Sequence, residues 1–284
     1  MKNTPKTNHS INYPINYNGL QKTAIQAAHA SGKVLMKYFR KKITVNVKPD
    51  LGLVTNADIE SEKAALKVLK KGFPDFGVLT EESAAQKGTS PGTWILDPLD
   101  GTTNYAHGLP LFCVSIAAEW KGELVVGVVY HPVTRETFTA IRGKGAYLNG
   151  KRICVSSTRK LKDAFLSTGF TSNKDAHLTH ELEAFERLSR ATQGVRRPGA
   201  AALDLANVAR GVFDGFWEMG LAPWDVAAGS LLIHEAGGKT TNFAGNRLIL
   251  DGQQVLASNG FIHLDFVKEV SSTVSAAERD SAQI

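Results

Sequence analysis

Hydrophobic residues recur at helical spacing near the start of the chain, and a second helical segment follows soon after. Between Leu20 and Phe39 they return every three or four positions, which predicts an amphipathic helix. A second helix is predicted in VTNADIESEKAALKVLKKGFPD, residues 54–75, because acidic residues open this segment and lysines close it. Gly72 and Pro74 mark the end of that helix.

Strand-like runs follow these helices. Phe76–Thr80 and Thr93–Leu96 are short apolar runs, and each leads directly into acidic residues. Open α/β sheets bind their ligands at the ends of strands, so these carboxylates mark a candidate site. From Phe112 to Val155, apolar runs alternate with Lys-Gly, Pro-Val-Thr and Asn-Gly turns, which predicts an antiparallel meander.

The remainder of the chain alternates between strands and helices. Strands are predicted at 164–169 and 213–219, and helices at 178–192, 200–210 and 224–235. Gly237 and Gly238 end the last helix. The pattern predicts one compact unit of mixed α+β and α/β character. We expect a loose arm at 1–18, an α+β half at 19–158 and an α/β half at 159–284.

Composition narrows the possible functions. The chain has 284 residues, of which 43% are hydrophobic, enough for a sizeable core. Its longest apolar runs, such as LVVGVVY at 124–130, are too short to cross a bilayer, so we expect a soluble, cytoplasmic protein without membrane contact. The net charge is +6, but the basic residues are scattered, which favours an anionic small-molecule substrate over nucleic acid. Cys113 and Cys154 are interpreted as reduced packing residues.

The stretch WILDPLDGTTNYAHGLP, residues 94–110, holds the candidate chemistry. Pro98 keeps Asp97 extended, so a turn from Asp97 to Gly101 would bring Asp97, Asp100 and the Leu99 carbonyl to one side. Two carboxylates that close repel each other, and a divalent cation relieves the repulsion. Because the turn holds neither His nor Cys, Mg²⁺ or Mn²⁺ fits better than zinc.

The residues after this turn favour a phosphate ligand. Gly101-Thr102-Thr103-Asn104 is interpreted as the start of a short helix, whose free N–H groups attract anions. An acid pair that binds metal next to such a helix start is typical of phosphoryl transfer. An Asp-Pro turn followed by an ordinary helix cap fits the same spacing equally well.

Five segments, in order along the chain, resemble the motifs of the inositol monophosphatase family. WILDPLDGTTNY is similar to the signature of this family, and the similarity extends from about Thr55 to Gly238. The other four segments are VTNADIESE (54–62), LTEES (79–83), GAAALDLANVARGVFDGFWEMG (199–220) and WEMGLAPWDVAAGSLLIHEAGG (217–238). The resemblance implies a layered αβαβα sandwich of the inositol monophosphatase and fructose-1,6-bisphosphatase type, and a homodimer.

The resemblance also implies a set of metal ligands. Glu81, Asp97 and the Leu99 carbonyl would hold one Mg²⁺, and Asp97, Asp100 and Asp225 would hold a second. A third, weaker Mg²⁺ near Glu81 and inhibition by Li⁺ are implied as well. Most of these ligands fall in the 19–158 half, whereas Asp225 falls in the 159–284 half.

Catalytic and substrate roles follow from the same resemblance. Asp58 and Thr102 would orient the attacking water, and the N–H groups of Gly101 and Thr102 would hold the phosphate. Glu218 would bind a polyol hydroxyl, with Asp225 beside it. The small residues that would admit the polyol ring are Gly199, Ala200 and Ala201.

The expected activity is therefore Mg²⁺-dependent hydrolysis of myo-inositol monophosphate. Fructose 1,6-bisphosphate and 3′-phosphoadenosine nucleotides stay open as substrates, and so does a regulatory role with the transcription machinery, which the resemblance to bacterial relatives implies. Tyr105 stands where the family signature has Phe, and Thr80 where Gly is common. In VKPDLGLV (47–54), interpreted as a loop, Lys48 does not align with the family's gating lysine.

Overall fold

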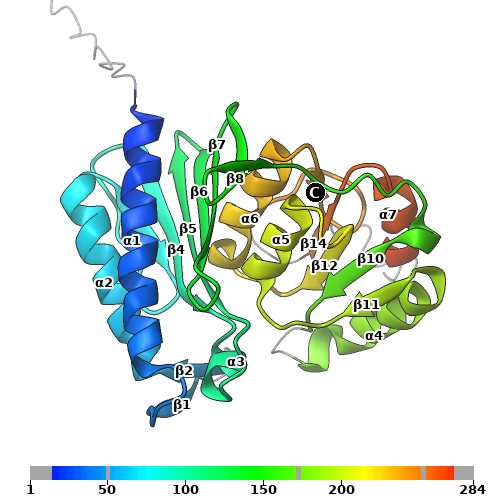
Figure 1. Cartoon of the computed structure of the whole chain (residues 1–284), viewed down its shortest axis with the longest axis horizontal. Helices are drawn as coiled ribbons and strands as arrows, with labels where there is room; N and C mark the ends of the chain where they lie inside the picture. Colours follow the sequence, from blue (N-terminus) through cyan, green and yellow to red (C-terminus); the bar gives the residue numbers. More distant parts are fainter. Residues whose placement is uncertain (1–14, 49–51, 171–173, 251–253, 272–284) are drawn as a thin grey trace, which may run out of the picture.

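A computed structural model of the chain describes residues 15–48, 52–170, 174–250 and 254–271. The elements are stacked in five layers that alternate between helices and sheets (Figure 1). This order confirms the expected αβαβα sandwich. Among the described residues, no helix is both long enough and apolar enough to span a bilayer.

Two antiparallel helices, α1 (Tyr17–Tyr38) and α2 (Asn56–Gly72), form the first layer. Both predicted helices are confirmed. Asn16 caps α1 by accepting from the Gly19 N–H at 3.0 Å, so this helix begins two residues inside the segment assigned to the arm. Residues 1–14 of that arm lie outside the described part of the chain.

The second layer is a seven-stranded sheet in the order β3-β4-β5-β6-β7-β8-β9. Only β3 and β4 pair in parallel, and every later pair is antiparallel, which confirms the predicted meander. The strands are β3 (Gly77–Thr80), β4 (Gly92–Asp100), β5 (Cys113–Trp120), β6 (Glu123–His131), β7 (Glu136–Ile141), β8 (Gly145–Leu148) and β9 (Lys151–Ile153).

The central layer contains α5 (Ala201–Ala209) and α6 (Pro223–Glu235), which lie between the two sheets. The run from Val226 to Ile233 is buried on every face of α6, as expected for a helix covered on both sides. Small residues permit this close packing. A Cβ on Gly127 of β6 would lie 2.8 Å from the Ala228 carbonyl oxygen.

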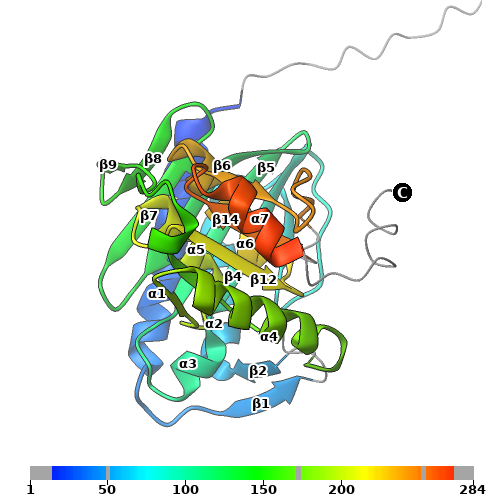
Figure 2. The same ribbon diagram turned by 90° about the vertical axis from the view of Figure 1, so that its right-hand side faces the viewer.

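The fourth layer is a five-stranded sheet in the order β11-β10-β12-β14-β13. Its strands are β10 (Phe165–Thr168), β11 (Gly194–Arg196), β12 (Gly215–Met219), β13 (Lys239–Thr241) and β14 (Gln254–Ser258). Figure 2 shows its outer face covered by α4 (Lys174–Ala191) and α7 (His263–Ser271). The chain passes from the first sheet to the second through the short 3₁₀ helix η1 (Leu161–Asp163).

The buried imidazole of His263 joins α7 to the second sheet. Thr241 Oγ1 donates to the Asn242 carbonyl, so at 3.1 Å it accepts from Nε2 of His263. Ser258 Oγ accepts from the Gly260 N–H and donates to Nδ1 at 2.8 Å. This network fits a neutral ring, and burial, helped by the charge of Lys239, lowers the pKa of His263 to about 4.

Several elements differ from the expectations. The segment interpreted as a loop, 47–54, overlaps an antiparallel pair of strands, β1 (Val45–Lys48) and β2 (Gly52–Thr55), while residues 49–51 lie outside the description. The edge strand β11 was not predicted, nor was any of β13, β14 and α7. Cys113 is buried as expected, but Cys154 is exposed and is not a packing residue.

Candidate active site

A β-bulge places Asp97 and Asp100 on one side of the sheet. In a regular strand, residues three apart point to opposite faces. Here Asp97 pairs with Ser115 and Asp100 with Cys113, so β4 has one more residue than β5 over this stretch. The expected turn from Asp97 to Gly101 is thus wrong in form, because β4 continues through Asp100, and the extra residue redirects the side chains.

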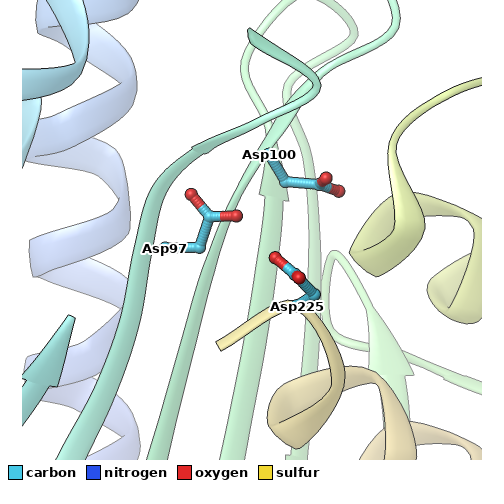
Figure 3. A group of neighbouring side chains, drawn as sticks. All are labelled: Asp97, Asp100 and Asp225. Carbon is cyan, nitrogen blue, oxygen red and sulfur yellow. The ribbon is translucent and has the colours of Figure 1, made fainter. Parts of the chain in front are cut away.

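Asp225 joins this pair from the first turn of α6. Its Oδ2 accepts from the Ala222 N–H at 2.8 Å, and this bond fixes the start of the helix. Each of Asp97, Asp100 and Asp225 offers one oxygen, and the three oxygens lie within 4.8 Å of one another. Figure 3 shows the Asp97 and Asp225 side chains turned toward each other, with Asp100 next to them and turned toward the start of α5 (Ala201–Ala209).

The pKa values of all three carboxylates are raised, mainly by burial and, for Asp97 and Asp225, also by neighbouring charges. Burial, followed by the charges of Glu81, Asp100 and Asp225, raises the pKa of Asp97 well above its usual range. Burial raises the pKa of Asp100 to about 6. The pKa of Asp225 rises to about 7, through burial and then the charge of Asp100.

A hard divalent cation fits this donor set. Buried carboxylates that repel one another are stabilised by a bound cation, and oxygen donors suit Mg²⁺ or Mn²⁺. The nearest sulfur, Cys113 Sγ, lies 3.4 Å from Asp100 Oδ2 and donates to it. Burial raises the pKa of the Cys113 thiol well above its usual range, so this residue stays protonated and does not act as a thiolate ligand.

Asp58 links α2 to the residues after the bulge. Thr55 caps α2, and its N–H and hydroxyl both donate to Asp58 Oδ2, at 2.8 and 2.6 Å. The other oxygen, Oδ1, lies 3.1 Å from the Thr102 hydroxyl. Burial raises the pKa of Asp58, while these hydrogen bonds oppose that rise.

Gly101 and Thr102 begin the short helix α3 (Thr102–Ala106), as the sequence predicted. Gly101 has a φ of 88°, and a Cβ there would lie 2.9 Å from the Leu111 carbonyl oxygen, so this position requires glycine. The Thr102 hydroxyl also lies 3.0 Å from the Leu99 carbonyl. The Leu99 carbonyl oxygen, which is the expected metal ligand, therefore already has the Thr102 hydroxyl as a neighbouring donor. The Leu99 side chain is buried.

Asp100 caps the N-terminus of α5. The N-cap residue, Ala200, has no side-chain acceptor for the first N–H groups of the helix. The Asp100 carboxylate takes this role, because it accepts from the N–H groups of Ala201 and Ala202 at 3.2 and 2.9 Å. The expected substrate segment, Gly199 to Ala201, is thereby held against the carboxylate cluster. The backbone N–H of Ala201 therefore already donates a hydrogen bond to Asp100.

Glu218 is buried near the end of β12 and faces the same region. Burial, followed by the charges of Glu181, Asp225 and Asp100, raises its pKa well above the usual range. Gly169, after β10, leaves the space for this carboxylate, because a Cβ there would lie 2.1 Å from Glu218 Oε2. Glu218 is therefore a confined acceptor and not a solvated strand end.

Glu81 follows directly after β3 and is partly buried. It is not among the three carboxylates that meet within 4.8 Å. Its charge nevertheless acts on Asp97, as the raised pKa of Asp97 indicates. The structure thus brings the expected ligands to one region, with Glu81 at its border.

Comparison with known proteins identifies the family to which this chain belongs. A sequence profile described as the inositol monophosphatase family matches residues 16–275, nearly the whole chain. The chain belongs to the inositol monophosphatase family. Members are metal-dependent phosphatases, and the acidic cluster of this chain agrees with that chemistry.

Relatives within this family have two kinds of name. "Nus factor SuhB" of Pseudomonas aeruginosa is 43% identical over 243 residues, 83% of this chain and 90% of that protein. "Inositol-1-monophosphatase" of Mesorhizobium japonicum is 42% identical over 255 residues, 89% of this chain and 96% of that protein. The solved structure of extragenic suppressor protein suhB from Bartonella henselae has a TM-score of 0.86 and 38% identity, covering 90% of this chain and 99% of that one.

Sequence reasoning gave no role to three residues that lie beside the carboxylate cluster. Asn104 Nδ2 lies 2.8 Å from both the Leu111 and Pro198 carbonyls, which ties α3 to the segment before α5. Gly169 admits Glu218, and Asp204 is a further buried carboxylate on α5. The run LDLANVA could have indicated Asp204, since one acid in an apolar helix is unusual.

Proposed function

We propose that this chain hydrolyses myo-inositol monophosphate to myo-inositol and inorganic phosphate, in a Mg²⁺-dependent reaction. One observation carries the proposal: the meeting of Asp97, Asp100 and Asp225 beside the helix start at Gly101 and Thr102. The relative named inositol-1-monophosphatase, at 42% identity, supports the choice of substrate.

The proposed ligands divide into two sets. Glu81, Asp97 and the Leu99 carbonyl would hold one Mg²⁺; Asp97, Asp100 and Asp225 would hold another; and a weaker third would bind near Glu81. When bound, these ions make a water molecule more acidic and neutralise charge on the phosphate and the leaving oxygen. Inhibition by Li⁺ belongs to the same proposal.

The protein's own groups would position the reactants. Asp58 holds the Thr102 hydroxyl at 3.1 Å, so this pair would orient the attacking water. The N–H groups of Gly101 and Thr102, at the start of α3, would hold phosphate oxygens. Uncatalysed phosphomonoester hydrolysis is so slow that the site must lower the barrier by about 20 kcal/mol, mostly through positioning and charge neutralisation.

The polyol would bind between Glu218 and the segment Gly199–Ala201. A carboxylate in a confined, buried position accepts strongly from hydroxyl groups, and the segment Gly199–Ala201 has no bulky side chain that would keep a ring away from its backbone. Fructose 1,6-bisphosphate and a 3′-phosphoadenosine nucleotide are the alternative substrates. A family structure titled inositol monophosphatase-fructose 1,6 bisphosphatase, 26% identical, supports testing the first.

A second role with the transcription machinery is favoured by the relatives named Nus factor SuhB. An Asp97→Asn variant separates the two functions. If it loses phosphatase activity and still replaces the natural protein in cells, the second role stands. If it fails in both assays, the enzyme alone explains the data.

Phosphate release from the three esters tests the primary proposal. Each ester is assayed with Mg²⁺, with EDTA, and with Mg²⁺ plus Li⁺. We expect Mg²⁺-dependent, Li⁺-inhibited release that is fastest with myo-inositol 1-phosphate. Release that persists in EDTA, or none from any ester, would contradict it. Sedimentation of the same preparation tests the expected homodimer.

A further inference from the structure

The inner face of α2 carries three buried polar side chains. Asp58, Ser61 and Glu62 stand at positions i, i+3 and i+4, so they share one side of the helix. Their exposed fractions are 0%, 0% and 4%, although α2 is an outer-layer helix with water on its other side. Buried polar groups at this spacing must have partners within the protein.

Each of the three side chains holds a different segment of the site. Asp58 contacts the Thr102 hydroxyl at 3.1 Å, and the Ser61 hydroxyl lies 3.1 Å from the Pro98 carbonyl, inside the bulge. Glu62 Oε2 accepts from the Thr80 hydroxyl at 2.6 Å and from the Glu82 N–H at 3.0 Å. One helix therefore fixes three chain segments relative to one another.

The two residues that donate to Glu62 lie on either side of Glu81 in the sequence. Thr80 and Glu82 are its immediate neighbours, and both donate to the same carboxyl oxygen of Glu62. Bonds on both sides of one residue restrict the backbone at that residue, and hence the direction of its side chain. Thr80 is itself only 4% exposed, so the bond between Thr80 and Glu62 is shielded from water.

We propose that Glu62 and Thr80 are positioning residues that set the affinity of the site for Mg²⁺ by holding Glu81 toward Asp97. The inference rests on the proposed function, in which Glu81 is a metal ligand. Groups that orient a metal ligand typically change metal affinity by roughly 10- to 100-fold when they are removed.

Thr80 contributes a donor that a glycine at this position would lack. The family resemblance indicates Gly as the common residue at this position, and Gly has no hydroxyl to donate. The β-branched side chain of Thr also favours the extended backbone of β3, whose last residue is Thr80. Thr80 thus adds a second donor to Glu62 where the backbone N–H of Glu82 would otherwise act alone.

Four variants test the proposal. Thr80→Val removes the hydroxyl at nearly constant volume, and Thr80→Ser restores it. Glu62→Gln keeps an acceptor oxygen, whereas Glu62→Ala removes both bonds. Thr241→Val is the matched control, because Thr241 is also buried and hydrogen-bonded, but lies on the edge strand β13 of the other sheet.

Mg²⁺ binding to the full chain is measured by calorimetry, together with the Mg²⁺ concentration that gives half-maximal phosphate release and the kcat at saturating Mg²⁺. For Thr80→Val we expect binding about 10-fold weaker, with a kcat within about 2-fold of wild type, and for Glu62→Ala a larger loss. Thr80→Ser and Glu62→Gln should bind nearly as wild type does. Thr241→Val should lose thermal stability alone.

Unchanged Mg²⁺ binding in Thr80→Val and Glu62→Ala would overturn the proposal and leave these residues a purely structural role. Equal losses in Glu62→Gln and Glu62→Ala would also overturn it, because charge and not position would then matter. If the wild-type chain binds Mg²⁺ but releases no phosphate, the proposed function fails, while the calorimetric comparison still decides the role of Thr80 and Glu62.

Discussion

Replacing Asp225 by Asn should make the metal-free protein more stable. The wild-type cluster forces three carboxylates together, with one oxygen from each within 4.8 Å of the others. Asn has nearly the same shape as Asp, and its oxygen still accepts from the Ala222 N–H that starts α6. The substitution therefore removes a charge while it preserves the helix cap.

The size of the effect follows from the geometry. Two full charges 4.8 Å apart repel by about 3 kcal/mol at an effective dielectric constant of about 20. The pKa of Asp225, about 7 against an ordinary 3.8, leads to a similar figure, about 4 kcal/mol when the carboxyl is fully ionised. Because Asp225 is only partly buried and its neighbours take up protons, we expect a gain of about 2 to 4 kcal/mol at pH 8.

The pH dependence has a definite sign. A carboxyl whose pKa is raised by folding takes up a proton in the folded state, so its penalty is absent below pH 3.8 and grows as the pH rises through about 7. The advantage of Asp225→Asn over wild type should therefore be largest at pH 8 and roughly a third as large at pH 5. Mg²⁺ should reverse it, since only the wild-type cluster gains from the ion.

Thermal unfolding in EDTA and in Mg²⁺, at pH 5 and pH 8, measures these differences. A gain of 2 to 4 kcal/mol corresponds to roughly 4 to 8 °C in Tm for a chain of this size. Asp163→Asn, an exposed carboxyl on η1, is the control and should leave Tm unchanged. A lower Tm for Asp225→Asn in EDTA at pH 8, or an undiminished response to Mg²⁺, would refute the reasoning.

Three further outcomes are expected. Gly169→Ala should displace the Glu218 carboxylate, because the added Cβ would lie 2.1 Å from Glu218 Oε2. We expect the KM for myo-inositol 1-phosphate to rise about 10-fold while p-nitrophenyl phosphate is turned over normally; equal KM values for the wild type and the variant would contradict this. Neutral His263 contributes stability above pH 6.5 that is lost as the pH falls toward about 4. In urea titrations, the free energy of unfolding of His263→Gln should therefore fall less steeply with decreasing pH than that of the wild type, by up to about 1.4 kcal/mol per pH unit; the same pH dependence in both proteins would count against this. Tyr105→Phe should cost about 1 kcal/mol, because the bond from its hydroxyl to the Leu35 carbonyl at 2.6 Å is lost, and a large loss of kcat would show that this hydroxyl has a role beyond the core.

Periodicity predicted the elements that have one polar and one apolar side. Helix α1 and the longer strands of the meander, β5 and β6, repeat a pattern over eight or more residues, while the charges at its two ends predicted α2, and the turn residues around them predicted the short strands β8 and β9. Strands β11 and β13 have only three residues each, which is too short for a pattern to show. No helix or strand was predicted beyond Gly238, because the positions of β14 and α7 depend on contacts with the rest of the second sheet.

The site was predictable in its residues but not in its geometry. Asp97 and Asp100 stand out in the sequence, but the bulge that brings them together depends on the register with Ser115 and Cys113 of β5. Asp225 lies on another element far along the chain, and only the resemblance connected it to them. The packing of Gly169 against Glu218 exists only in three dimensions.

Phosphate release from myo-inositol 1-phosphate by the wild-type chain and by Asp97→Asn, each with Mg²⁺ and with EDTA, tests the metal-dependent phosphatase most directly. Asp97 stands in both proposed ligand sets, and its carboxylate is nearly identical in shape to the amide that replaces it. We predict rapid release from wild type with Mg²⁺ only, and a loss of at least about 1,000-fold in Asp97→Asn. Equal rates for the two proteins, or undiminished release in EDTA, would contradict the assignment.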